Sequence, residues 1–314
     1  MLVSVCIPCY NAEKYVCAAL TSILAQTYQP IEIIAVNDGS TDSSAVVLNQ
    51  FAERGVRVIH QQNAGQCAAA NRAWNEATGD YIKFFDADDI MHPQMVEKQM
   101  MRLAGSNSDI ASAGWGRFYS DDHDSFTLSP QSVWRDMDAR DWLVEAWMDA
   151  RPMMQCALWL IPRRILQKTG GWDEELSLIN DFEFFARVLS QAKNIRFTPD
   201  VPLMYRSGLP GSLSGRKSDA AIESAFHSLM RGTEHLLNVR NDSKAMHACA
   251  NVLQDFIYTY YPCRVDLRKQ IKNRVTDLGG SDRAPTGSPK FDLLRKFVGW
   301  KLARILQLLA TAVQ

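Results

Sequence analysis

The sequence predicts an α/β protein in which a mostly parallel sheet carries helices on both faces and an α-helical C-terminal region follows. Residues 1–100 alternate β-branched, apolar runs with amphipathic helical patterns, and repeated β-α units of this kind require a parallel sheet. From residue 217 to about 278 the apolar residues recur with a helical period only. With 314 residues, 46% of them hydrophobic, the chain can bury one large α/β domain with a helical appendage, or two domains.

The elements of the parallel sheet follow from local patterns. Val, Ile and Phe fill the strand-like runs, and Gly, Asn, Asp and Ser separate these runs from the helical patterns. Asn11 is placed to cap the first helix. The expected order is strand 2–8, helix 12–26, strand 31–36, a helix that ends near residue 53, strand 56–60, helix 66–77 and strand 80–85.

Three of these strands end in polar clusters, which read PCYN, NDGS and DADD. Parallel sheets bind ligands beyond the carboxyl ends of their strands, so Tyr10, Asp38 and Asp88 are expected to line one crevice although they are far apart in sequence. Neither GxGxxG nor GxxxxGK[ST] is present, which excludes the common dinucleotide and P-loop ways of binding phosphate.

Three carboxylates, Asp86, Asp88 and Asp89, directly follow the fourth strand. Like charges this close disfavour ionisation unless a positive charge, most often a metal ion, stabilises them. Oxygen ligands suit Mg²⁺ or Mn²⁺, which keep several waters and bind substrate phosphates. The cluster therefore predicts a divalent cation that holds a diphosphate.

Three segments together carry a family resemblance. They are VSVCIPCYNAEKYVCAALTSILAQTYQPIEIIAVNDGSTD, HQQNAGQCAAANRAWNEATGDYIKFFDADDIMHP and GGWDEELSLINDFEFFARV. In order and spacing they resemble the segments that mark glycosyltransferase family 2, over roughly residues 1–206. The resemblance implies a GT-A fold, a nucleotide-sugar donor, most often a UDP-sugar, and inversion at the anomeric carbon. It also implies a saccharide or lipid-linked saccharide as the acceptor, as in bacterial surface-polysaccharide or glycolipid assembly.

The resemblance further implies roles for particular residues. Asp38 would accept a hydrogen bond from the nucleotide base, Asp88 would ligate Mn²⁺ or Mg²⁺, and Asp181 would be the catalytic base. Inverting transfer is a single displacement, so the base and the departing diphosphate need separate sites, and these two aspartates lie in separate segments. The residues that would bind the nucleotide-sugar are Pro8, Tyr10, Asn11, Asp38, Asp86 and Ala87.

Two residues near the proposed base have alternative interpretations. Asp181 begins the helical pattern DFEFFARVL, so its carboxylate is expected in the first turn, where the helix dipole favours the charged form. An isolated aspartate there is more often a helix cap than a base, and the upstream segments are what favour the base. Trp172 is equally expected to stack on an acceptor sugar or to pack in the core.

Several positions depart from the family pattern. Asn37 and Asn180 stand where acidic residues are common, Ala70 stands where an arginine is common, and YRSGLPGSLSG lacks the usual histidine. Without a neighbouring acidic group at Asn180, the pKa of Asp181 is expected to be slightly lower. Candidates for supplying positive charge in place of the histidine are Arg206, Arg216 and Lys217.

Two alternative functions remain open, the first of them because of these departures. One is a non-catalytic homologue that binds a nucleotide-sugar as the partner of another enzyme. The other, with less support, is an aspartate-nucleophile phosphatase, whose DxDx[TV] motif also follows a strand. Here Asp89 and Ile90 follow DAD, and the motif lies after the fourth strand rather than the first.

The composition limits which binding partners and which cellular compartment are expected. A net charge of -1 argues against nucleic acid held by a bulk basic surface. Seven scattered cysteines indicate reduced, packed thiols. The N-terminal residues lack a signal-peptide pattern, and no stretch reaches the roughly 20 apolar residues of a membrane span. The sequence therefore favours a cytoplasmic protein.

The C-terminal residues form a basic amphipathic pattern. Large apolar residues, among them Phe291, Phe297 and Trp300, alternate with five lysines and arginines between residues 290 and 304. Such a helix is expected to lie on the inner face of the cytoplasmic membrane, although a homodimer contact or packing against the catalytic domain is equally compatible. The expected organisation is a GT-A domain at 1–216, a helical region at 217–278, a linker at 279–289 and the amphipathic helix at 290–314.

Overall fold

The computed structural model describes residues 1–119, 121–150, 152–209 and 218–312. The strands are β1 Val3–Cys9, β2 Ile31–Asp38, β3 Val56–Gln61, β4 Tyr81–Phe84, β5 Ile110–Tyr119, β6 Asp122–Leu128, β7 Met137–Asp138, β8 Ile161–Pro162 and β9 Asn194–Ser207. The helices are α1 Val16–Leu24, α2 Ser44–Ala52, α3 Gln66–Glu76, α4 Met95–Leu103, α5 Ala139–Met148, α6 Arg163–Thr169, α7 Asn180–Gln191, α8 Asp219–Val239, α9 Ser243–Thr259, α10 Val265–Asp277 and α11 Pro289–Ala312, with a 3₁₀ turn η1 at Cys156–Leu158.

The first sheet has the strand order β3-β2-β1-β4-β8 and is parallel except for β8. Its inner strands are apolar on both faces because helices cover them, and α3 packs on β1 and β2. Cys9 pairs with Asn37, and Asn37 pairs with His60, so these strands end side by side. This arrangement confirms the predicted α/β class and brings the segments that follow β1, β2 and β4 to one edge.

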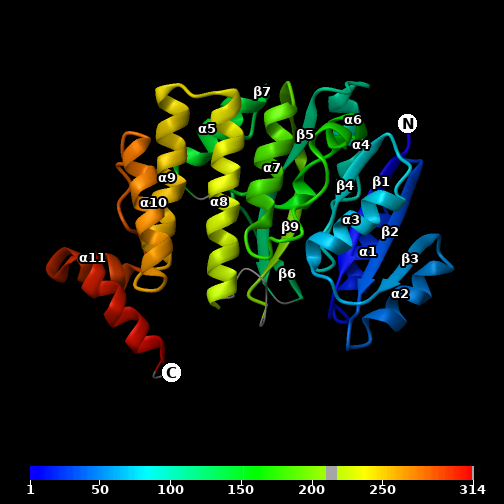
Figure 1. The fold of residues 1–314 in the computed structure, drawn as a ribbon. Helices are drawn as coiled ribbons and strands as arrows, with labels where there is room; N and C mark the ends of the chain where they lie inside the picture. Colours follow the sequence, from blue (N-terminus) through cyan, green and yellow to red (C-terminus); the bar gives the residue numbers. More distant parts are fainter. Residues whose placement is uncertain (120, 151, 210–217, 313–314) are drawn as a thin grey trace.

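A second sheet adjoins the segment that follows β4. Its order is β6-β5-β9-β7, with β5 and β9 parallel and the outer strands antiparallel. An antiparallel bridge between Ile90 and Met204 ties the segment after β4 to β9. Figure 1 shows this sheet in the middle of the molecule, between the parallel sheet and the C-terminal helices. The acidic loop that follows β4 therefore lies where the two sheets meet.

The first helix begins later than its sequence pattern predicts, and Asn11 does not cap it. α1 starts at Val16, because residues 12–15 form a turn whose first N–H, that of Ala12, donates to Ser44 Oγ at 2.7 Å. Asn11 adopts a left-handed φ of 48°, and its Oδ1 accepts a hydrogen bond from Thr41 N at 2.8 Å. Asn11 thus fastens the end of β1 to the loop that follows β2.

The C-terminal region is helical as expected. α8 packs on α7, and α9 packs on α5, α8 and α10. The segment after α10 has no regular structure, yet it is held along α9, since Ser281 Oγ donates to Asn251 Oδ1 at 2.6 Å and Tyr258 donates to the Arg283 carbonyl at 2.9 Å. α11 bends at Gly299, whose φ of 75° and ψ of 156° are not helical.

The sequence led us to expect packed, reduced cysteines and no membrane-spanning helix. All seven cysteines are free, and five of them are buried, which agrees with packed, reduced thiols. Within the described ranges, every helix is too short or too polar to cross a bilayer.

Candidate functional site

The acidic loop after β4 is anchored by two of its three aspartates. Asp89 is fully buried, and its carboxylate accepts hydrogen bonds from Arg206 N at 2.9 Å and Gln155 Nε2 at 2.7 Å. Asp86 accepts from Gln66 Nε2 and from the same Gln155 amide, both at 3.0 Å. These bonds give Asp86 and Asp89 positions that are fixed by protein donors.

Asp88 differs from its neighbours, because it is partly exposed and, among the described residues, only its own backbone N–H supports the carboxylate. Burial and the nearby Asp86 raise the pKa of Asp88 to about 7, although Arg206 opposes the shift. A carboxylate that lacks a side-chain donor and lies beside a second acid fits a divalent cation. The described ranges hold no group of three or more His, Cys, Asp or Glu that could hold a metal ion.

Gln155 orients this loop, although no motif in the sequence marks it. Its Oε1 accepts from Ala157 N at 2.7 Å, which fixes the amide so that Nε2 faces both aspartates. η1, which Gln155 precedes, is in turn held by Lys83, whose buried Nζ donates to the Ala157 carbonyl at 2.6 Å. Burial lowers the pKa of Lys83 to about 7. β4 therefore carries one buried polar side chain, Lys83, that helps to position the acidic loop.

The Arg206 guanidinium forms hydrogen bonds with protein groups and stacks on two aromatic rings. Its Nε donates to the backbone carbonyl of Asp88 at 2.7 Å, its Nη1 bonds Asp121 Oδ1 at 2.5 Å, and its guanidinium stacks on Tyr15 and Phe118 at 4.7 and 4.5 Å from the ring centroids. Arg206 is 3% exposed, so it supports the acidic loop from the protein interior. The other two candidate cations, Arg216 and Lys217, lie outside the described residues.

Asp181 lies in the first turn of α7, as predicted, but it does not cap the helix. The N-cap position is Ile179, in a left-handed conformation and without a side-chain cap. Among the described residues no group donates to the Asp181 carboxylate, and burial together with the charge of Asp86 raises its pKa well above the ordinary value. The capping interpretation is therefore wrong.

A short hydrogen-bond chain connects Asp181 to the acidic loop. Asn180 accepts from Asp181 N at 2.9 Å and donates to Gln66 Oε1 at 3.3 Å, while Gln66 donates to Asp86. Asn180 also donates to Cys67 Sγ at 3.1 Å. The expected effect of Asn180, a pKa of Asp181 slightly lower than with an acidic neighbour, stays a prediction, while burial and the charge of Asp86 raise this pKa above the ordinary aspartate value.

The predicted nucleotide-sugar residues lie at the same edge with different exposures. Tyr10 and Asn11 are exposed, Pro8 is half-buried, and Ala87 is buried. Asp38 is 2% exposed, and its carboxylate accepts from Gln61 Nε2, Ala64 N and Gly65 N at 2.8 to 2.9 Å. Asp38 therefore shapes the loop before α3. A small pocket at this end of the sheet is lined by Pro8, Gln66, Ala70, Phe84, Asp86, Cys156 and Trp172.

Trp172 packs as a core residue. It is 7% exposed, its ring stacks on Phe184 with centroids 3.9 Å apart, and it meets Phe84 edge to face at 5.2 Å. Asn71 fixes its backbone, because Trp172 N donates to Asn71 Oδ1 at 2.7 Å and Asn71 Nδ2 donates to the Trp172 carbonyl at 2.9 Å. A Cβ at Gly171 would lie 2.3 Å from that Oδ1, so glycine is required there.

Glu183 holds this loop to α7 and α8. The carboxylate, 3% exposed, accepts from His235 Nε2 at 2.9 Å and Arg187 Nε at 2.7 Å. Arg187 then donates to the carbonyls of Thr169 and Gly171 at 2.6 and 2.9 Å. Burial alone would raise the pKa of Glu183, but the bonds from His235 and Arg187 outweigh it and lower the pKa to about 2.

A stability prediction follows for Glu183→Gln. Because the folded pKa is lowered from 4.5 to about 2, the ionised carboxylate stabilises the fold above pH 4.5, and that contribution, about 3 kcal/mol, is lost as the pH falls toward 2. Urea unfolding at several pH values should show a wild-type advantage at pH 7 that shrinks at pH 3.5. The surface pair Arg135–Glu145 provides a control, since Glu145→Gln should cost less than about 1 kcal/mol. A Glu183 difference that is independent of pH would contradict the assignment.

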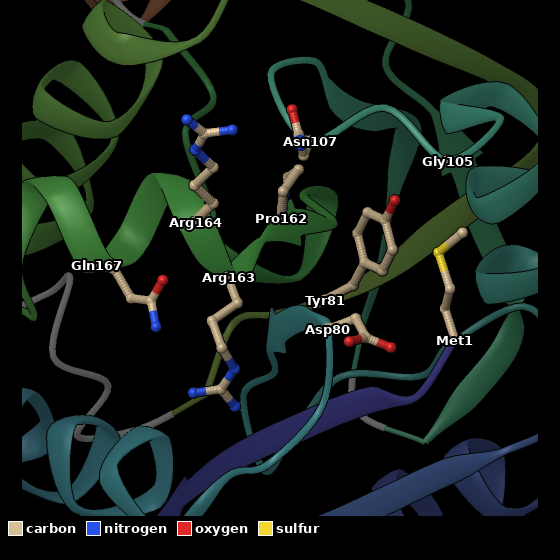
Figure 2. Close-up of a pocket in the computed structure, with 9 residues that line it drawn as sticks. All are labelled: Met1, Asp80, Tyr81, Gly105, Asn107, Pro162, Arg163, Arg164 and Gln167. Atoms are coloured by element: carbon tan, nitrogen blue, oxygen red, sulfur yellow. The ribbon is translucent and has the colours of Figure 1, made fainter.

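Another pocket lies elsewhere. It has a volume of about 310 Å³, and Figure 2 shows it between Asp80 and Tyr81, at the start of β4, and Arg163 and Arg164 of α6. The acidic loop follows the opposite end of β4, so this pocket is not part of the site.

A parallel sheet that ends in an acidic loop, joined to a smaller mixed sheet and facing a second carboxylate on α7, is the arrangement of a GT-A fold. The profile of glycosyl transferase family 2 matches residues 4–170. The chain belongs to glycosyltransferase family 2.

Related proteins match parts of the chain. The uncharacterized glycosyltransferase YibD of Escherichia coli (strain K12) is 42% identical over 116 residues, which are 36% of this chain and 34% of that protein. The uncharacterized glycosyltransferase EpsJ of Bacillus subtilis (strain 168) is 29% identical over 224 residues, 68% of this chain and 63% of that protein. Glycosyltransferase GlyA of Streptococcus pneumoniae serotype 4 is 40% identical over 120 residues, 38% of this chain and 17% of that protein. The matches thus span less than two thirds of each relative.

Solved structures share the fold over most of the chain. Staphylococcus aureus TarS 1-349, in complex with UDP-GlcNAc, superimposes with a TM-score of 0.71 at 18% identity and covers 88% of this chain and 80% of that one. The same fragment in complex with UDP gives a TM-score of 0.67.

Proposed function

We propose that the protein is an inverting glycosyltransferase that moves a sugar from a nucleotide-diphosphate donor, a UDP-sugar, to an acceptor hydroxyl. The observation that carries this proposal is the pair Asp88 and Asp181. Both carboxylates have raised pKa values, and neither accepts a hydrogen bond from another described side chain. They come from separate elements, as a single displacement requires. Family membership supports the reaction class, and the TarS complex with UDP-GlcNAc supports the donor class.

The donor side of the proposed site is built by the acidic loop and the end of β1. Asp88 would hold Mg²⁺ or Mn²⁺, and the bound cation would neutralise charge on the departing diphosphate. Pro8, Tyr10 and Asn11 would border the nucleotide. Asp86 and Ala87 would face the ribose or the sugar. Asp38 would contact the base through lone pairs that its three protein donors leave available.

The acceptor side depends on Asp181. Its carboxylate takes the proton of the acceptor hydroxyl while that oxygen attacks the anomeric carbon, and the bond from this carbon to the diphosphate oxygen breaks with its electron pair on the diphosphate. Because burial and Asp86 raise the pKa of Asp181, the carboxylate is a stronger base than an exposed aspartate. Hydrogen bonds through Asn180 and Gln66 fix the position of Asp181 relative to the acidic loop.

A donor hydrolysis assay tests the proposed function. Transferases slowly hydrolyse their donors without an acceptor, so a radiolabelled UDP-sugar should lose its sugar in Mn²⁺ and should keep it in EDTA. A non-catalytic homologue would bind the nucleotide-sugar without turnover, and a phosphatase would instead cleave a phosphomonoester. Either of these results would reject the proposal.

We also propose the domain division that the sequence indicates, a GT-A domain at 1–216, a helical region at 217–278, a connecting segment at 279–289 and the helix at 290–314. The last of these is proposed to bind the inner face of the cytoplasmic membrane. Phe297 is 79% exposed, and Leu293 and Leu309 are each 60% exposed, while the lysines at 290, 296 and 301 are exposed and form no ion pair among the described residues. Exposed apolar side chains beside unpaired cations fit an anionic bilayer surface.

The opposite side of α11 packs on the protein. Phe291 is 2% exposed beneath Arg304, and Trp300 meets the rings of Tyr258 and Tyr261 at 4.9 and 5.0 Å. Phe291 and Trp300 therefore do not belong to the exposed stripe, although the sequence grouped them with Phe297. In Figure 1, α11 lies at the lower end of the molecule, toward which the strands of the parallel sheet run. A membrane on that side would present a lipid-linked acceptor to the site.

Liposome sedimentation tests this attachment. The full chain should pellet with anionic liposomes at low salt, and a truncation after Gly279 should stay in the supernatant. A variant with Phe297→Ser and Leu302→Ser keeps the packed side of α11 and should also lose binding. Met101, 68% exposed on α4, provides the control, since Met101→Ser should pellet like the wild type. If the truncation pellets equally, the membrane proposal fails, and sedimentation equilibrium of both proteins would then test a homodimer.

A further inference from the structure

Arg117 is an exposed cation on the second sheet, close to the candidate site. It sits on β5 opposite Tyr205 of β9, and its guanidinium carbon lies 5.2 Å from the Trp115 ring centroid and 5.3 Å from that of Tyr205. Arg117 Nη1 donates to Ser207 Oγ at 2.8 Å. Among the described residues no carboxylate forms an ion pair with it. The guanidinium is thus held in place while several of its N–H groups remain available.

Strand geometry separates Arg117 from the donor side. Successive side chains of a strand point to opposite faces, so Tyr205 and Arg206 diverge. Arg206 contacts Tyr15 and Phe118, on the face toward the nucleotide end of β1, and Tyr205 contacts Arg117 and Trp115 on the other face.

Tyr205 also connects this face to the reaction centre. Its neighbour Met204 bridges Ile90, and its other neighbour, Arg206, donates from N to Asp89 and from Nε to the Asp88 carbonyl, so this part of β9 borders the acidic loop.

We infer that Arg117, with Trp115 and Tyr205 as its platform, binds an anionic group, a phosphate or a carboxylate, on the acceptor. A guanidinium presents parallel N–H donors that match such an anion, and stacking on two rings keeps it oriented at little entropic cost. Arg117 would then select acceptors by charge at a point away from the reacting hydroxyl. This inference rests on the proposed transferase function, and it goes beyond it by naming the acceptor's chemistry.

The test uses the full chain loaded with saturating UDP and Mg²⁺, so that the donor site is filled. Glucose 6-phosphate is titrated while tryptophan fluorescence is recorded, with glucose as the neutral probe. We expect saturable binding of glucose 6-phosphate and no such binding of glucose. Arg117→Gln should weaken the binding at least about 10-fold, as expected for loss of a charged hydrogen-bond donor. UDP affinity should stay unchanged.

Arg54→Gln is the matched control. Arg54 is also exposed, stacks on one ring at 4.8 Å and lacks an ion pair among the described residues, but it follows α2, away from β5 and β9. Its replacement should leave glucose 6-phosphate binding unchanged. Equal binding by Arg117→Gln and the wild type, equal binding of glucose, or no saturable binding by the UDP-loaded protein would each overturn the inference. If UDP itself does not bind in Mg²⁺, the proposed transferase function fails instead.

Discussion

Asp88→Ala is expected to remove the metal dependence of UDP binding and to lower sugar transfer by at least about 100-fold, since a cation on the diphosphate supplies several kcal/mol of charge stabilisation. The change should leave the loop folded, because Asp89 and Asp86 make the bonds to Gln155 and Arg206 that fix it. UDP titrations in Mg²⁺, Mn²⁺ and EDTA measure the effect. In the wild type the three curves should differ, and in the variant they should coincide.

Asp89→Asn separates metal binding from loop support. Asp89 faces two protein donors, and an amide cannot accept from both without turning its NH₂ group toward one of them. The variant should therefore lose thermal stability while UDP binding keeps its dependence on Mg²⁺. Unchanged turnover in Asp88→Ala, or equal loss of metal dependence in both variants, would show that Asp88 is not the ligand.

Local patterns were sufficient to predict the parallel sheet. β1, β2 and β4 are mainly apolar runs, and the turn residues that end each strand lie within the same sequence segment. The convergence of the polar clusters at one edge followed from parallel topology alone. The start of α1 did not follow, because residues 12–15 are held by Ser44, which is distant in sequence.

The support of the site depends on contacts that no local pattern contains. Gln155 lies in an apolar stretch without a motif, yet it bonds two aspartates more than 60 residues upstream. Trp172 was compatible with either a sugar contact or packing until Phe184 was found stacked on its ring. In α11 the periodicity identified an amphipathic helix, but the bend at Gly299 changes which apolar residues face outward. The sequence therefore predicted where the strand ends with their carboxylates converge better than it predicted the residues that hold those carboxylates in place.

Asp181→Asn is expected to lower transfer by at least about 100-fold, the lower end of general-base contributions, and to leave UDP binding intact. Asparagine has the same size and does not disturb the helix start, because Asp181 is not the cap. Initial rates with a radiolabelled donor, alongside UDP titrations, separate the two effects. Transfer near the wild-type rate, or loss of UDP binding, would reject the role of Asp181 as the base.

The pH profile gives a second, independent readout of the base. Because burial and Asp86 raise the pKa of Asp181, transfer should fall as the pH drops through that raised value, above the pH at which an ordinary aspartate titrates. Asn180→Asp adds a carboxylate next to the base, so it should move this acidic limb to higher pH. The residual rate of Asp181→Asn should show no such limb, since its amide cannot titrate. An acidic limb that stays in place in both variants would assign the proton transfer to another group.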